Sequence, residues 1–141
     1  MDKAKVYFTN LHTNPDNNIY KKLERLITKA GIDQIDFKDK IVAIKLHFGE
    51  YGNLAYLRPN YTKIVADHIK KMGGKVFLTD CNTLYPGSRK NALEHMDCAN
   101  LNGFNTITTG CQIIIGDGLR GTDEVEVPVA NGEYCETALI G

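Results

Sequence analysis

The sequence predicts an α/β fold: a mostly parallel sheet of βαβ units in three layers, followed by a C-terminal antiparallel ribbon. Strand-like and helix-like segments alternate from residue 5 to residue 115, which implies right-handed crossovers between parallel strands. After residue 122 the apolar residues alternate with polar ones, as in antiparallel pairs. We expect residues 1–141 to form a single α/β domain. Because the chain stops in strand-like sequence, we also expect it to be a fragment of a longer protein.

The first strand is expected at residues 5–9, KVYFT, where β-forming residues alternate. A helix should follow, with Asn14 as its N-cap, Pro15 as its first residue and Gly31 at its end. The run IVAIKLHF at residues 41–48 is nearly continuous in apolar residues and predicts a strand buried on both faces.

Two more helices are expected between the later strands. Pro59 should start one that ends at Gly73 and Gly74, and Ser88 should cap another that ends near Gly103. Each has apolar residues at helical spacing. These helices would complete the βαβ crossovers.

The remaining strands are expected at residues 75–80 and 111–115. The ribbon is expected at residues 122–141, with Asn131 and Gly132 as its two-residue turn. Such a ribbon exposes a strand edge, so homo-oligomerisation through it is an expectation.

Composition disfavours several classes of protein. Lys plus Arg and Asp plus Glu are 17 each, so no overall positive field favours nucleic acid as a partner. No apolar run approaches the roughly 20 residues of a membrane span, and no signal peptide is recognisable. The four cysteines contain no Cys-x-x-Cys pair, so they are interpreted as reduced thiols of a cytoplasmic protein.

Polar residues cluster where the strands are predicted to end. In open parallel sheets this carboxyl edge is where ligands bind. We take His47, Lys45 and Glu50 as candidate catalytic residues. Nine further residues are candidate ligand-binding residues: Asn53, Arg58, Asp80, Asn82, Thr83, Tyr85, Ser88, Arg89 and Asp117.

The expected ligand is a small anion, a carboxylate or a phosphate. Arg58 and Arg89 lie at or beside helix starts, where backbone N–H groups already favour negative charge. In the alternative interpretation nothing binds, because Lys45 pairs with Glu50 or Asp80 and Arg89 pairs with Asp117.

The four histidines are interpreted differently. His47 follows a strand and is a candidate proton shuttle or metal ligand, although no metal-binding motif is present and no metal site is predicted. His68 lies on an apolar helical stripe and is interpreted as a core histidine with a hydrogen-bond partner. His12 and His95 are interpreted as solvent-facing. Cys81 lacks an adjacent base and is interpreted as an inert thiol.

The segment from Gly116 to Gly121 matches the dinucleotide-binding pattern G-x-G-x-x-G. The pattern requires a helix after the glycines, but TDEVEVPV alternates and contains Pro128. We therefore interpret these glycines as a turn.

Four ordered blocks, VAIKLHFGEYGN, FLTDCNTLYPGSR, the 91–104 helix ending in NGF, and IIIGDGLRG, resemble the domain-of-unknown-function 362 family of uncharacterised iron–sulfur proteins. Members of this family typically continue well beyond this point, and many carry a ferredoxin-like segment with two cysteine-rich cluster motifs. The resemblance therefore implies 4Fe–4S clusters in a downstream region and none within this segment. It assigns no role to any residue.

Three hypotheses follow. In the first, the domain belongs to an iron–sulfur-associated redox protein and binds a small anion near the carboxyl ends of the strands at 41–48 and 75–80. In the second, it is a non-redox isomerase, racemase or transferase in which His47 or Lys45 moves a proton. In the third, it is a non-catalytic binding or scaffold module, which mutual pairing of the polar residues without an open cleft would favour.

Overall fold

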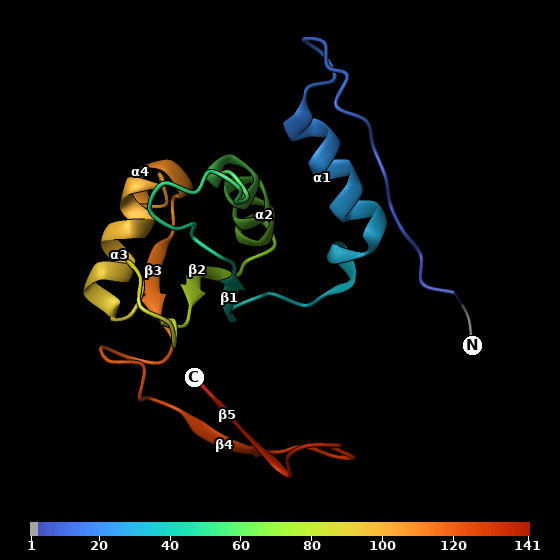
Figure 1. The fold of residues 1–141 in the computed structure, drawn as a ribbon. Coiled ribbons are helices and arrows are strands. Elements are labelled where there is room, and N and C mark those ends of the chain that lie inside the picture. Colours follow the sequence, from blue (N-terminus) through green and yellow to red (C-terminus); the bar gives the residue numbers. More distant parts are fainter. Residues whose placement is uncertain (1–2) are drawn as a thin grey trace.

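The computed structural model describes residues 3–141 (Figure 1). Its helices are α1 (Ile19–Ala30), the 3-10 helix η1 (Ile32–Gln34), α2 (Pro59–Lys71), α3 (Ala92–Leu101) and α4 (Thr106–Thr109). Its strands are β1 (Ile41–Lys45), β2 (Lys75–Asp80), β3 (Gln112–Ile115), β4 (Val125–Pro128) and β5 (Thr137–Ile140). None of the helices in the described part is long and apolar enough to cross a bilayer.

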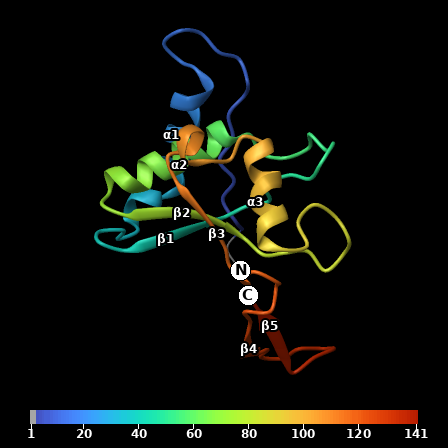
Figure 2. The ribbon, with the colours of Figure 1, turned by 90° about the vertical axis from the view of Figure 1, so that its left-hand side faces the viewer.

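The strands form a parallel sheet in the order β1-β2-β3 and a separate antiparallel pair β4-β5. Ile44 pairs with Leu78, which pairs with Ile113 on the next strand. This confirms the predicted α/β class with a parallel sheet and a C-terminal ribbon. Figures 1 and 2 show the ribbon beyond the carboxyl ends of the sheet strands, apart from the helices.

One face of the sheet carries the core. Because alternate residues of a strand point to opposite faces, Leu78 and Ile115 face the helices and are buried, whereas Ile41 and Ile114 face away and are exposed. Phe48, Phe104 and the small residues of α2 and α3 complete the buried cluster. Within residues 3–141 no helix covers the other face, so the third layer that the sequence predicts is not present in this part of the chain.

The predicted strand at residues 5–9 is wrong. This segment is extended and runs beside α1, but it has no strand partner, and Val6 and Phe8 are 89% and 84% exposed (Figure 1). Its anchor is the buried ammonium group of Lys22, which donates to the Asn10 side chain at 2.7 Å. Alternation of β-forming residues indicates an extended backbone, but it does not supply a neighbouring strand.

Two helix starts differ from prediction. Helix α1 begins four residues late, because Asn18 accepts from the backbone N–H groups of Tyr20 and Lys21, while Asn14 forms a preceding turn. The expected Ser88 cap is also wrong, since Asn91 caps α3. Both Asn14 and Ser88 are suitable N-cap residues, so residue type alone cannot choose between neighbouring candidates.

Other boundaries are confirmed. Pro59 is the first residue of α2, and Gly31 ends α1 with a φ of 101°, a left-handed conformation that favours glycine. The strand at 75–80 matches prediction residue for residue. Asn131 lies in the connection between β4 and β5 with a φ of 60°.

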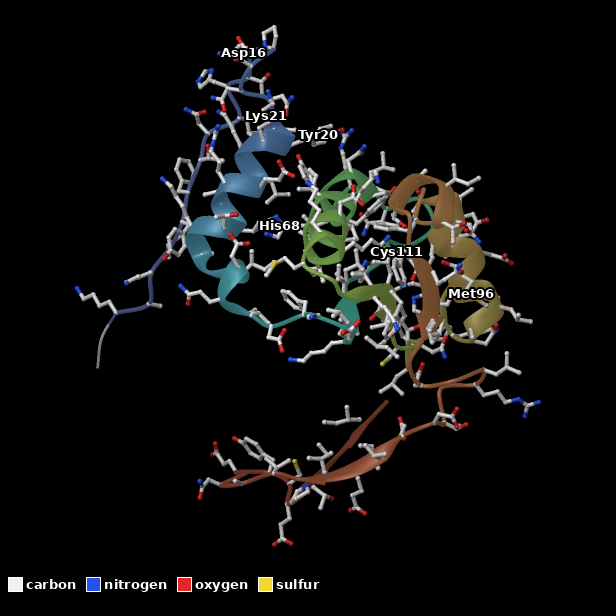
Figure 3. All side chains as sticks on the ribbon, turned by 180° about the vertical axis from the view of Figure 1, so that it is seen from behind. Asp16, Tyr20, Lys21, His68, Met96 and Cys111 are labelled. Atoms are coloured by element: carbon white, nitrogen blue, oxygen red, sulfur yellow. The ribbon has the colours of Figure 1, made fainter. Side chains whose placement is uncertain are left out.

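Helix α1 packs against α2 at the side of the molecule. His68 lies on the side of α2 toward α1 and η1 (Figure 3). Its Nε2 lies 2.5 Å from Asp33 Oδ1, so this mostly buried histidine has a polar partner, as predicted.

Two phenylalanines test this core. Phe104 is fully buried against Phe48, whereas Phe8 is largely exposed. We expect Phe104→Ala to lower the free energy of unfolding by about 3–5 kcal/mol and Phe8→Ala by no more than about 0.5 kcal/mol in urea titrations. Equal losses for the two variants would contradict the described core.

Candidate functional site

Arg89 is the centre of a buried ionic network at the carboxyl edge of the sheet. Its side chain is only 3% exposed. Nε donates to Glu50 Oε2 at 3.1 Å, Nη1 lies 3.4 Å from Asp80 Oδ2, and Nη2 donates to the Tyr85 hydroxyl at 2.5 Å. The guanidinium therefore joins the loop after β1 to the loop after β2.

Glu50 makes the second connection between these loops. Its Oε1 accepts hydrogen bonds from the backbone N–H of Ser88, at 3.1 Å, and from the Ser88 hydroxyl. Partial burial raises the pKa of Glu50, but donation from Arg89 and from backbone N–H groups outweighs burial and lowers it. The carboxylate is therefore held ionised as part of the scaffold.

Asp80 ends β2 and accepts from Lys45 Nζ at 2.7 Å. Burial raises its pKa, but the nearby His95 and Lys45 side chains and the Cys81 backbone N–H outweigh this effect and lower the pKa to about 2. His95 Nε2 is 3.7 Å from Asp80 Oδ2, too far for a hydrogen bond, so Lys45 is the stronger donor in this geometry. The same contact raises the pKa of Lys45, which keeps its side chain cationic.

Asn82 and Asp117 connect the ends of β2 and β3. The backbone N–H of Asn82 lies 2.9 Å from both carboxylate oxygens of Asp117. The Asn82 side-chain Nδ2 donates to Asp117 Oδ1 at 3.0 Å and to the Gly118 carbonyl at 2.9 Å. These bonds fix the amide with its Oδ1 pointing away from Asp117.

The glycines from Gly116 to Gly121 form a turn, as predicted. The next element is β4, so no helix N-terminus lies behind this turn to hold a pyrophosphate. Gly121 packs beside Asp117 and Asn82, where an added Cβ would lie 3.0 Å from Asp117 Oδ2. The absence of a side chain at Gly121 therefore allows the turn to pack closely against the Asn82–Asp117 contact.

The sequence interpretation missed His95. It was expected to face solvent, but its exposed fraction is 0%, and its ring lies edge-on to Phe48 at a centroid distance of 5.7 Å. The spacing of Ala92, His95 and Ala99 indicates their common face, because all three lie on the buried side of α3. Apolar residues occur on more than one side of α3, since Leu93 and Leu101 are exposed, and this concealed the signal.

An open cleft of about 460 Å³ lies over the network. Its walls come from the end of β2, the loop after it, the Gly116–Gly121 turn and the last residues of β5. Three cationic residues line it, Lys45, Lys90 and Arg120. In the described part of the chain, Lys90 and Arg120 form no ion pair, and both are exposed.

The cleft also contains acidic groups. Asp80 and Asp117 are buried and accept from groups of the protein, so much of their charge is already compensated. Glu124 is exposed at the cleft wall. The exposed ammonium and guanidinium groups therefore remain the groups best placed for a ligand.

The structure brings together only part of the predicted site. Lys45, Glu50, Asp80, Tyr85, Ser88 and Arg89 form one network, and Asn82, Thr83 and Asp117 adjoin it. Arg89 pairs with Glu50 and Asp80, so its expected pairing with Asp117 is wrong, whereas the pairing of Lys45 with Asp80 is confirmed.

Three predicted site residues lie elsewhere. His47 is exposed, and its Nδ1 accepts from the Gly49 backbone at 2.9 Å. Asn53 accepts from the Ala55 backbone in an exposed turn. Arg58 lines a second cleft at the start of α2, so it does not share the cleft of Lys45.

The residues present do not fit an iron–sulfur cluster. Among residues 3–141, no three His, Cys, Asp or Glu side chains are grouped so that they could hold a metal. Cys98 and Cys111 are buried in the core, and Cys135 is exposed on the ribbon. Burial and the nearby Asp117 raise the pKa of Cys81, which agrees with its interpretation as an inert thiol.

The fold and site define an α/β domain with a charged cleft at the carboxyl edge of a parallel sheet. A family model for a domain of unknown function (DUF362) matches residues 42–141. Since this match covers more than half of the chain, the chain belongs to the DUF362 family. The matched region includes nearly the whole parallel sheet and the ribbon but not α1. No curated protein and no solved structure matches the chain.

Substitution of two arginines, the buried Arg89 and the exposed Arg120, tests whether the network stabilises the fold. Arg89→Met leaves the buried carboxylate of Asp80 and the partly buried carboxylate of Glu50 without their shared cation, so we expect a loss of about 3–5 kcal/mol in unfolding free energy. Arg120→Met, at an exposed position, should change it by less than about 0.5 kcal/mol. Urea unfolding measures both, and a tolerated Arg89→Met would refute the buried network.

Asp80 should make the free energy of unfolding depend on pH in the acidic range. Its folded pKa of about 2 lies below the ordinary 3.8, so its stabilisation is present above about pH 4 and is lost as the pH falls toward 2. The difference corresponds to about 2 kcal/mol. Unfolding free energies from pH 5 to pH 2 should fall more steeply for the wild type than for Asp80→Asn. Equal slopes would contradict this assignment.

Proposed function

We propose that this domain binds a small anion, a carboxylate or a phosphate, in the cleft at the carboxyl ends of β1 and β2. The observation that carries the proposal is the group of three exposed cations at one cleft, two of them without an ion-pair partner in the described chain. Arg120 and Lys90 approach from the turn after β3 and the loop after β2, and Lys45 ends β1. Charge-assisted hydrogen bonds from such groups favour anions.

The network below the cleft gives these cations a rigid base. Arg89 is fully engaged with Glu50, Asp80 and Tyr85, so we assign it to the scaffold and not to the ligand. Lys45 has only one partner and its side chain is 67% exposed, so it can turn toward a ligand.

The isomerase, racemase or transferase hypothesis is less well supported. Lys45 beside Asp80 has a raised pKa, which favours a cationic role over proton abstraction. His47 does not line the cleft. A redox role with clusters outside this segment rests on the family resemblance alone. The four free cysteines support a reducing compartment, and we include a cytoplasmic location in the proposal.

A non-catalytic scaffold is the second candidate function. It is favoured by one observation, the mutual pairing of Glu50, Arg89, Asp80 and Lys45. The open cleft above this network favours ligand binding instead.

Titration with phosphate and with succinate, at constant ionic strength, tests anion binding. In ¹H–¹⁵N spectra we expect saturable shifts at Lys45, Asn82 and Arg120. Lys45→Met and Arg120→Met should each weaken binding by about tenfold, because each removes one charge-assisted contact.

Lys63→Met is the matched control, since Lys63 is exposed on α2 and pairs with Asp67 away from the cleft. It should leave the affinity unchanged. Shifts that fail to saturate, or equal losses in all three variants, would refute the anion site and favour the scaffold.

A further inference from the structure

His95 is a buried histidine with an unused nitrogen. Nδ1 lies 3.4 Å from Asn82 Oδ1, while Nε2 has no hydrogen-bond partner. The ring is fully buried, and a buried polar atom without a partner destabilises a fold. The position of Nε2 therefore calls for an explanation beyond packing.

The nearest acceptor for Nε2 is the carboxylate of Asp80. Nε2 is 3.7 Å from Oδ2, slightly beyond hydrogen-bond distance. The Asn82 side chain cannot replace this acceptor, because its Nδ2 is held by Asp117 and Gly118 and its Oδ1 faces Nδ1. A small movement of the Asp80 carboxylate would bring it into contact with Nε2.

Lys45 is the partner that Asp80 can lose. The Lys45 side chain is 67% exposed, whereas the Asp80 side chain is 8% exposed, so the ammonium can move into the cleft and the carboxylate cannot. Without Lys45, the described donors nearest to Asp80 Oδ2 are Arg89 at 3.4 Å and His95 at 3.7 Å. With only these long side-chain contacts besides the Cys81 backbone N–H, the buried carboxylate is poorly satisfied.

We propose that His95 is a positioning residue that donates from Nε2 to Asp80 when Lys45 turns to an anion in the cleft. The inference rests on the proposed anion binding. In the free protein Lys45 holds Asp80 through Oδ1, and in the bound protein His95 donates to Oδ2 instead. Because Asn82 Oδ1 can only accept, Nδ1 keeps its hydrogen, so the donating ring is an imidazolium with a hydrogen on each nitrogen. The exchange keeps the buried carboxylate satisfied and releases the ammonium of Lys45 for the ligand, which strengthens anion binding.

The tautomer of His95 gives a test without mutation. Long-range ¹H–¹⁵N spectra of the wild type should show hydrogen on Nε2 of His95, with a stronger hydrogen-bond signature at saturating phosphate. A hydrogen on Nδ1 alone would overturn the proposal, since Nε2 would then face Asp80 as a second acceptor.

Two substitutions separate the contacts of His95. In His95→Gln the amide nitrogen takes the place of Nε2 and keeps a donor for Asp80, whereas in His95→Asn it takes the place of Nδ1. We expect phosphate affinity to stay within about twofold in His95→Gln and to fall by about five- to tenfold in His95→Asn. His12→Asn, in an exposed loop, is the control and should bind as the wild type does.

A second measurement does not depend on the ligand. In ¹³C titrations, the pKa of Asp80 should rise above about 2 in His95→Asn and stay near the wild-type value in His95→Gln. If the wild type binds phosphate but His95→Asn binds it equally well, the role of His95 is wrong while the proposed function stands. If the wild type binds no anion, the proposed function fails and the exchange at Lys45 fails with it.

Discussion

The structure depends on one buried cation, the guanidinium of Arg89. Parallel strands deliver their loops to one edge of the sheet, and those loops need a common attachment. Arg89 provides it by bonding Glu50 from the loop after β1, and Asp80 and Tyr85 from β2 and its loop. A planar group with several donors suits this task, because it can satisfy two carboxylates at once.

This constraint divides the charged residues into two groups. Arg89, Asp80 and Asp117 are buried and act as scaffold together with the partly buried Glu50. Lys45, Lys90 and Arg120, in contrast, reach solvent at the cleft. Asp80 belongs to both groups, because it is buried below the cleft and also holds Lys45. His95, behind Asp80, extends the network from the cleft into the core.

The sequence predicted the parts of the fold that depend on local patterns. The strand at 75–80, the proline at the start of α2 and the final ribbon are signals of this kind. The apolar run at 41–48 correctly indicated β1, but the strand ends at Lys45 and one of its faces is exposed, so its predicted burial on both faces is wrong. Prediction failed where a distant partner decides. Residues 5–9, for example, lack a neighbouring strand. Helix α4 was not predicted for a different reason: it has only four residues, although Asn105 caps it locally.

The site was predicted only in part for the same reason. Residue types and strand ends indicated the charged edge, but they could not show which carboxylates Arg89 would pair with, or that Arg58 would line a different cleft.

A crystal structure of the domain soaked in phosphate tests the central claim most directly. We expect density for the anion between Lys45 and Arg120, with Lys45 turned away from Asp80. Density only beside Arg58, or an unchanged contact between Lys45 and Asp80 with no anion in the cleft, would contradict it.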